Sequence, residues 1–345
     1  MNPSIAWSDS ARQAAFERWI AGLASVHGID IGSLEPASVD ASFRRYFRVA
    51  AGQRSLVVMD APPPLEDVRP FVRVGRLIRA AGLHVPEVLA ADTGQGFLLL
   101  SDLGRRPYLE ALQMASPAEA DRLMRQALSA LVQLQCRVPP QDLPPFDEGL
   151  LAAELALFPQ WCVQREFAIT WTAREQSAWQ GLCRLLIDSA LAQSVVAVHA
   201  DWMPRNLMVS EPNPGVLDFQ DAVAGPISYD LVSLLRDAFI SWPEAQEIDW
   251  AARWWTEARA AGLPVDPDFG EFWRALEWMG LQRHLKVLGI FCRLKHRDGK
   301  PRYAGDVPRF LGYASKVALR YAPLKPLLKL LEPLTGARVQ TGLTF

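Results

Sequence analysis

The chain has 345 residues, half of them hydrophobic and 21% charged, with a formal net charge of -2. No apolar run approaches the roughly 20 residues that span a bilayer, and no basic excess supports nucleic-acid recognition, so we expect neither a membrane nor a nucleic acid as partner. The four cysteines lie far apart without a CxxC pair, which argues against a disulfide framework or a zinc site and favours a reducing, cytoplasmic setting.

The first hundred residues contain short runs that are rich in β-forming residues. "FRRYFRVA" and "RSLVVMDA" precede a segment with helical spacing, "LEDVRPFVRVGRLIRAAG", which ends at Gly82. "HVPEVLAAD" and "GFLLLSDLG" then flank the turn-forming "DTGQG". These patterns predict a small sheet. The "GQG" of the turn lacks the later glycine of a dinucleotide-binding fingerprint, so we interpret it as a hairpin turn.

After Gly104 the pattern becomes mainly helical. "SPAEADRLMRQALSALVQLQCRV" opens with capping-box spacing between Ser116 and Glu119. Further helices are predicted near residues 173–192, 228–240, 244–262 and 270–295. The sequence therefore predicts an α+β fold of two lobes, a small β-rich N-terminal lobe over residues 1–104 and a larger, mainly helical C-terminal lobe over residues 105–345.

One stretch, "VHADWMPRNLMVSEPNPGVLDFQDA" at residues 198–222, concentrates polar side chains between apolar runs. Its two runs "NLMVS" and "GVLDF" flank "EPNPG", which predicts a hairpin with Asn206 and Asp218 at its open end. An amide oxygen and a carboxylate are ligands suited to Mg²⁺, which completes its coordination with water and phosphate oxygens. Asp201, just before the hairpin, would then accept a proton from a substrate hydroxyl in phosphoryl transfer.

The order of these residues is that of protein kinases. His199, Asp201 and Asn206 reproduce the H-x-D-x-x-x-x-N spacing, and "LDFQ" stands where kinases have D-F-G. We assign His199 a supporting role in the loop, and Asp230 a structural role, either capping the helix that follows or bracing the catalytic loop. The interval "DFQDAVAGPISYD" is too short for a peptide-docking activation segment, which favours a small-molecule acceptor.

The runs "HADWMPRNLM" and "VLDFQDAVAGPISYDLVSLLRD" resemble the aminoglycoside phosphotransferase superfamily, which has a protein-kinase-like fold. "DASFRRYFRV", "VVMDAPP" and "GLQRHLKVLGIFCRLKHRDGKPRY" are similar to its bacterial subgroup of anomeric kinases for N-acetylmuramate and N-acetylglucosamine. The resemblance implies an ATP- and Mg²⁺-dependent kinase of the C1 hydroxyl of an amino sugar in peptidoglycan recycling. It also implies Asp201 as the base and Asn206 and Asp218 as the Mg²⁺ ligands.

The sequence departs from the wider kinase pattern around the nucleotide. The covering loop "ASFRRYFRV" has no glycine, and "SLVVMDAPP" lacks the strand lysine that normally holds the phosphates. Arg44, Arg45 and Arg48 are the candidates to replace it, because a guanidinium can hold phosphate oxygens bidentately, although solvated strand residues would look the same. Backbone groups from Leu100 to Asp102 are candidates to bind adenine.

The acceptor side is less defined by the sequence. Besides Asp201, the candidate substrate-binding residues are Trp202 and Arg205 in the loop and Arg283 and Lys286 on the last predicted helix. The two helix cations suit an acceptor carboxylate, while a solvated charged face is the commoner explanation of such a stripe. Two other functions stay open, a kinase of another alcohol such as an aminoglycoside or choline, and a catalytically silent nucleotide- or sugar-binding regulator. We expect a monomer.

Overall fold

The chain folds into two compact units. The small unit comprises residues 1–114 and 205–221, and the large unit comprises residues 115–204 and 222–345. The first two residues of the predicted covering loop, positions 41 and 42, lie outside the described part of the chain. The computed structural model describes residues 5, 7, 9–39, 43–63 and 65–335.

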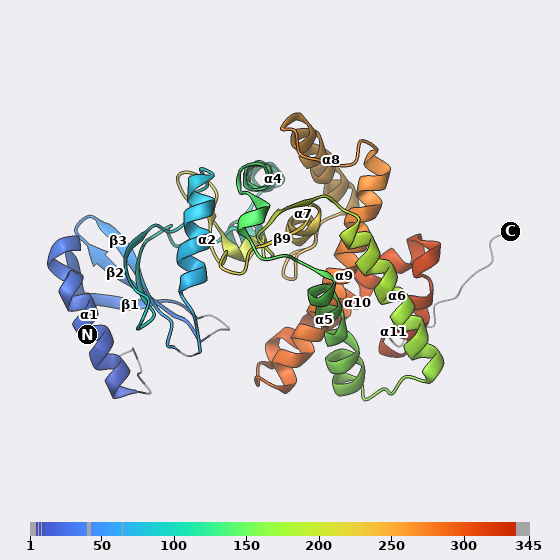
Figure 1. The fold of residues 1–345 in the computed structure, drawn as a ribbon, viewed down its shortest axis with the longest axis horizontal. Coiled ribbons are helices and arrows are strands. Elements are labelled where there is room, and N and C mark those ends of the chain that lie inside the picture. Colours follow the sequence, from blue (N-terminus) through green and yellow to red (C-terminus); the bar gives the residue numbers. More distant parts are fainter. Residues whose placement is uncertain (1–4, 6, 8, 40–42, 64, 336–345) are drawn as a thin grey trace. The chain divides into compact units, whose positions relative to one another are not determined.

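A five-stranded antiparallel sheet forms the centre of the small unit, with strand order β1-β2-β3-β5-β4 (Figure 1). The predicted turn at "DTGQG" joins β4 to β5, as expected from its glycines. The elements of this unit before the hairpin are α1 (Ser10–His27), β1 (Ile29–Val39), β2 (Arg45–Ala51), β3 (Arg54–Asp60), α2 (Arg69–Ala80), β4 (Val88–Asp92), β5 (Phe97–Ser101) and α3 (Tyr108–Met114).

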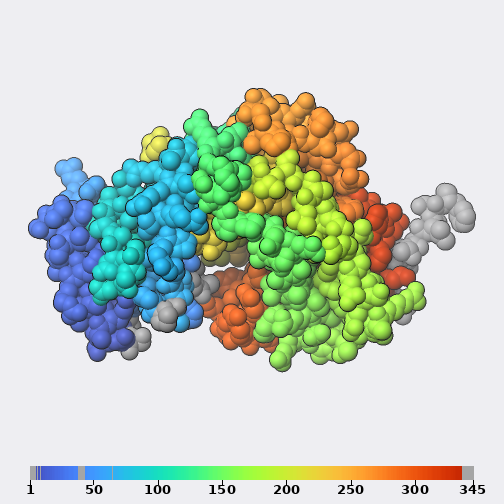
Figure 2. Space-filling model, in the orientation of Figure 1, coloured from blue at the N-terminus to red at the C-terminus, as the bar shows by residue number. Residues whose placement is uncertain are grey.

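Helix α1 packs against the sheet through apolar side chains and through an ion pair. Phe16 and Ile20 are fully buried against a core that includes Phe47 and Phe97, and the dark blue residues of α1 form one face of the unit in Figure 2. Arg12 of α1 also donates to the fully buried carboxylate of Asp60 at the end of β3, with 2.9 Å from Nε to Oδ1. The sequence pattern did not predict this helix.

The hairpin predicted around the proline-rich turn is present as β7 (Leu207–Met208) and β8 (Gly215–Val216). It packs within the small unit, because the Val216 amide donates to the His84 carbonyl at 2.7 Å and the Phe219 ring lies 4.7 Å from that of Phe71 on α2. The compact units therefore differ from the predicted lobes. The small unit extends to residue 114 and gains residues 205–221, since short strands need partners that sequence patterns do not reveal.

Helices dominate the large unit, in which only β6 and β9 pair, antiparallel, among its described residues. None of the described helices is long and apolar enough to cross a membrane. Its helices and strands are α4 (Pro117–Arg137), α5 (Glu148–Leu157), α6 (Ala173–Leu191), β6 (Val195–Val198), β9 (Val223–Pro226), α7 (Tyr229–Leu235), α8 (Glu244–Ala260), α9 (Phe269–His296), α10 (Val307–Arg320) and α11 (Pro326–Thr335).

Helix α9 is the centre of the large unit and packs against α5, α6, α7 and α10 (Figure 1). It begins at Asp268, whose carboxylate accepts from two amides of the first turn. Because helices surround it, most of its residues between 276 and 292 are buried, including Arg283. A solvated charged face is therefore the wrong interpretation for Arg283, and Lys286 beside it is only 19% exposed.

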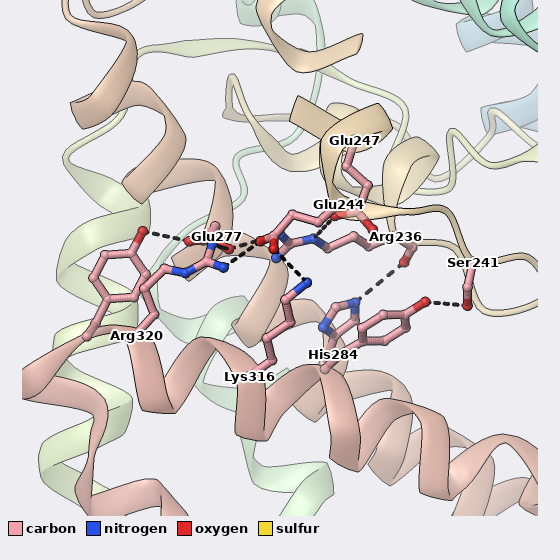
Figure 3. Close-up of polar contacts among 10 residues, drawn as sticks. Arg236, Ser241, Glu244, Glu247, Glu277, His284, Lys316 and Arg320 are labelled. Atoms are coloured by element: carbon pink, nitrogen blue, oxygen red, sulfur yellow. Dashed lines mark hydrogen bonds and ion pairs between the residues drawn. The ribbon is translucent and has the colours of Figure 1, made fainter. Parts of the chain in front are cut away.

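Helix α7 ends at Leu235, earlier than the predicted helix 228–240. Arg236 leaves the helical conformation, and its guanidinium donates to Glu247 of α8 and Glu277 of α9 at 3.0 and 2.9 Å (Figure 3). Arg320 of α10 donates to the same Glu277 at 2.6 Å. An unpaired buried charge is costly, so we attribute the end of α7 at Leu235 to this network of four helices.

The turn between β4 and β5 provides a stability test. Gly96 has φ +72°, and a Cβ there would lie 1.9 Å from the Ala61 carbonyl oxygen, whereas Gly52 has φ +64° with open space around it. We expect Gly96→Ala to lower the free energy of unfolding by more than about 3 kcal/mol and Gly52→Ala by about 1 kcal/mol. Urea titration measures both. Equal losses in the two variants would contradict the close packing at Gly96.

Candidate active site

The open end of the β7–β8 hairpin brings Asn206 and Asp218 together, as predicted. The Leu217 amide donates to the Asn206 carbonyl at 2.9 Å, and the Asn206 side-chain amide lies 3.4 Å from the Asp218 carboxylate. Asp218 has φ +61°, in the left-handed region that Asp and Asn adopt more readily than other residues with a side chain. This backbone turn directs the carboxylate to the end of the hairpin at a conformational cost, which is typical of functional positions.

The surroundings of Asp218 leave room for a ligand. Its side chain is 39% exposed, accepts from Gln220 Nε2 at 2.8 Å and from Asn206 Nδ2 at 3.4 Å, and lies 3.9 Å from Nη1 of Arg44. An amide oxygen and a carboxylate fit Mg²⁺, which binds few protein ligands and keeps several waters. No group of three His, Cys, Asp or Glu side chains in the described chain could hold a metal, so Mg²⁺ here would depend on substrate and water oxygens.

Of the three candidate arginines, Arg44 lies beside the metal-ligand candidate. It precedes β2, and its Nε donates to Glu66 at 3.0 Å while Nη1 approaches Asp218. Glu66 also accepts from the Phe43 amide at 3.1 Å, which ties this carboxylate to the backbone next to Arg44. Arg44 is therefore held between two carboxylates, at the edge of the hairpin end.

Arg45 and Arg48 have partners elsewhere in the small unit. Arg45 donates to the buried Asp60 at 2.9 Å and stacks 3.9 Å over the Trp7 ring. Arg48 donates to Asp102 at 2.5 and 3.0 Å and to the Gly104 carbonyl at 2.8 Å. Leu100, the first of the adenine candidates, is 2% exposed and pairs with strands on both sides of β5. Arg45 and Arg48 therefore bind different carboxylates of the small unit.

In the large unit, Asp230 braces the loop that carries Asp201. Its two carboxylate oxygens accept from the amides of His199 and Ala200 at 2.6 and 3.0 Å. Ala200 has φ +76°, and the amide of Asp201 donates to Nδ1 of His199 at 3.3 Å. Asp230 therefore binds the loop through its carboxylate and does not cap α7, whose N-cap position is Ser228.

Asp230 is fully buried, and burial raises its pKa to about 7. The amides of His199 and Ala200 lower the pKa, and the negative charge of Asp201 raises it. His199 is 1% exposed and contacts Trp202 edge to face. The loop is therefore held by buried groups, and His199 supports it as predicted.

Lys286 on α9 is close enough to Asp201 for their charges to interact. Its ammonium group is 2.5 Å from Glu154 of α5 and 3.0 Å from the Tyr229 hydroxyl. Burial opposes its charge, but the Tyr229 hydroxyl and the carboxylates of Glu154 and Asp201 raise the pKa of Lys286 overall. Lys286 is therefore a charged, internally neutralised residue whose field reaches Asp201.

The other three acceptor candidates differ in exposure. Trp202 is fully buried, which contradicts its prediction as a substrate-binding residue, because no face of its ring is open to a sugar. Arg205 is exposed. Arg283 is 3% exposed, and its Nη1 has no hydrogen-bond partner.

A cavity of about 550 Å³ in the large unit lies away from this loop. Ser194 and Ile227 line it, next to the start of β6 and the end of β9, whereas His199 and Asp201 follow the opposite end of β6. None of the predicted site residues lines it.

Sequence reasoning missed several members of the two clusters. Glu66 and Gln220 contact the side chains at the hairpin end, and Glu154 and Tyr229 contact Lys286. The position of Glu66 could have been used for prediction. It lies between β3 and α2, where kinases have the carboxylate that pairs with the phosphate-binding cation. The position of Glu154 could not, since it lies 132 positions from Lys286 along the chain.

The sequence is similar to known proteins along most of its length. Residues 33–273 match a family model described as the phosphotransferase enzyme family. The chain is 54% identical over 301 residues to the N-acetylmuramate/N-acetylglucosamine kinase of Pseudomonas aeruginosa, covering 87% of this chain and 88% of that protein. It is 46% identical over 337 residues to the protein of that name in Neisseria meningitidis, covering 97% and 99%.

A solved structure supports the fold. The ADP-bound aminoglycoside phosphotransferase APH(2'')-Ib superposes with a TM-score of 0.58 at 15% identity, covering 87% of this chain and 98% of that one. The predicted α+β, protein-kinase-like fold is confirmed, with a β-rich N-terminal part and a mainly helical remainder.

The buried Asp230 predicts a pH dependence of stability. Its carboxyl has a pKa of about 7 in the folded chain and 3.8 in the unfolded one, so the folded state binds the proton more tightly. The resulting stabilisation is complete below pH 3.8 and is lost as the pH rises through 7. When the pH rises from 5 to 7.5, we expect the free energy of unfolding of wild type to fall by about 2 kcal/mol more than that of Asp230→Asn.

Urea unfolding at both pH values measures this difference. Asp188→Asn is the control, because Asp188 is 59% exposed and should leave the wild-type dependence unchanged. An Asp230→Asn variant with the same pH dependence as wild type would show that the buried carboxyl is not responsible.

Proposed function

The chain belongs to the phosphotransferase enzyme family, and we propose that it transfers the γ-phosphoryl group of ATP to the C1 hydroxyl of N-acetylmuramate and N-acetylglucosamine. The acceptor assignment is supported by two curated relatives of that name, which are 46% and 54% identical to this chain. A cytoplasmic role in the recycling of peptidoglycan sugars belongs to the same proposal.

The observation that carries the chemistry is the pair Asn206 and Asp218 at the hairpin end, where Asn206 follows the braced Asp201 by five residues. Asn206 and Asp218 would hold Mg²⁺, which when bound neutralises charge on the phosphate oxygens. Their amide and carboxylate oxygens suit that ion, and the exposure of Asp218 allows it to bind.

Asp201 would accept the proton of the acceptor hydroxyl. As the C1 oxygen forms its bond to the γ-phosphorus, the bond from phosphorus to the β,γ-bridging oxygen breaks and ADP leaves with that electron pair. The hydroxyl proton passes to the Asp201 carboxylate. Asp230 keeps this carboxylate in position through the His199 and Ala200 amides, so positioning supplies much of the rate.

Arg44 is our choice for the cation that replaces the strand lysine. Arg45 and Arg48 each bind a carboxylate inside the small unit, so moving Arg48 would leave Asp102 without its cation and moving Arg45 would leave Asp60 with Arg12 alone. Arg44 instead lies beside Asp218 and is held by Glu66, as the strand lysine of kinases is held by a helix glutamate. Backbone groups from Leu100 to Asp102 remain our proposal for adenine.

A substrate panel tests the proposed function. Wild type with ATP and Mg²⁺ should release ADP with N-acetylmuramate and N-acetylglucosamine, and the product should carry phosphate on C1. Asp201→Asn should lose about 1,000-fold in kcat while keeping its ATP affinity, because it removes only the base. Glu211→Gln, an exposed change in the hairpin turn, should behave as wild type.

Other outcomes would contradict this proposal. Turnover only with aminoglycosides or choline would refute the sugar assignment, and nucleotide binding without turnover on any acceptor would favour a regulator. An active Asp201→Asn variant would remove the base from the mechanism.

The proposed contact between Arg44 and the phosphates of ATP is tested by comparing the binding of ATP with that of adenosine. Arg44→Ala should weaken ATP binding by about 100-fold, since charge-assisted bonds to phosphate are lost, and leave adenosine binding unchanged. Arg44→Lys should recover part of the loss. Arg105→Ala is the control, because Arg105 is 68% exposed and pairs with Glu35. Calorimetry measures both ligands, and equal losses for ATP and adenosine would argue against phosphate contact.

A further inference from the structure

Arg283 on α9 is a buried cation without a partner. It is 3% exposed, its Nη1 is fully enclosed, and it forms no hydrogen bond or ion pair with any residue that the structure describes. The two other buried arginines of the described chain are both paired. Arg48 binds Asp102, and Arg236 binds Glu247 and Glu277.

Such a residue is costly for the folded chain. A guanidinium stays charged at any accessible pH, so Arg283 cannot lose its charge when it is buried. Removing an unpaired charge from water costs several kcal/mol. Asp230 is near enough for the two charges to interact, but its oxygens already accept from the amides of His199 and Ala200. Arg283 therefore has donors that need an acceptor from outside the described chain.

Arg283 lies on α9 close enough to Asp230 of α7 for their charges to interact. Gly280, three residues earlier on α9, packs so closely on α7 that a Cβ would lie 2.7 Å from Val232. This face therefore contacts α7, which begins with Tyr229 and Asp230. The charges of Arg283 and Asp201 both act on Tyr229 and Asp230.

The neighbouring cation, Lys286, does not need an acceptor from outside the described chain. Lys286 is one turn further along α9 and is neutralised by Glu154 at 2.5 Å. Between the two cations on this face, only Arg283 has positive charge to offer a ligand. A planar guanidinium binds carboxylates bidentately, which suits an acidic group on the molecule that Asp201 deprotonates.

Resting on the proposed function, we propose that Arg283 determines acceptor specificity by binding a carboxylate of the sugar. N-acetylmuramate has a lactyl carboxylate that N-acetylglucosamine lacks, so the two acceptors differ by the group that Arg283 would bind. The enzyme then uses the acidic sugar with the higher kcat/KM. The neutral sugar leaves Arg283 without its partner.

The test compares both sugars in wild type and Arg283→Gln. We expect kcat/KM for N-acetylmuramate to fall roughly 10- to 100-fold in the variant, while that for N-acetylglucosamine changes less than about threefold. Arg283→Lys should recover part of the activity on the acidic sugar. Arg274→Gln is the control on the same helix, since Arg274 is 55% exposed and pairs with Glu271.

A second arm changes the substrate instead of the protein. The methyl ester of N-acetylmuramate has no negative charge, so wild type should use it about as poorly as Arg283→Gln uses the acid. In a double-mutant cycle the two changes should not add, because each removes the same contact. This arm does not depend on how well Arg283→Gln folds.

The outcomes separate the two proposals. Equal losses on both sugars would place Arg283 on the phosphoryl group or in the fold and overturn the specificity role, as would a wild type that uses the ester as well as the acid. A wild type that phosphorylates neither sugar would instead overturn the proposed function.

Discussion

The two hydrogen bonds that Asp230 accepts from the His199 and Ala200 amides are the interaction on which the candidate active site depends. Ala200 has a positive φ, a conformation that L-residues other than Asn and Asp seldom adopt without support. Because Asp230 is at the start of α7 and fully buried, it transmits the position of that helix to the Asp201 loop. The network around Arg236 and Glu277 in turn holds the end of α7 (Figure 3). Packing of the large unit and orientation of the base are therefore coupled.

Charge placement follows a common rule in both units. The sequence has no lysine before Lys286, so every cationic contact of the small unit is made by arginine. Its buried and half-buried arginines donate to carboxylates, as Arg48 donates two hydrogen bonds to Asp102. A planar guanidinium suits this because it loses little conformational entropy for each hydrogen bond formed. In the large unit Lys286 is neutralised in the same way by Glu154. Arg283 departs from the rule, and Arg44 lies between two carboxylates of which one is a candidate metal ligand.

Prediction from the sequence succeeded where the signal was local. The hairpin of β7 and β8 follows from its turn residues, and α9 follows from its periodicity. It was wrong where distant residues decide the outcome. Helix α7 stops early because Glu247 and Glu277 bind Arg236, and Trp202 is enclosed rather than open to a sugar. The segment 205–221 belongs to the small unit because its short strands and Phe219 find their partners there.

The sequence by itself determined the kinase-like fold, the order of Asp201, Asn206 and Asp218, and the meeting of the last two, since spacing and turn chemistry act over a few residues. Only the tertiary structure decided which arginine lies beside Asp218, which role Asp230 has, and which cation of α9 lacks a partner. The physical reason is that pairing and burial of a charge depend on groups brought together across the fold. Glu154 and Lys286, for example, are 132 positions apart in the chain and 2.5 Å apart in space.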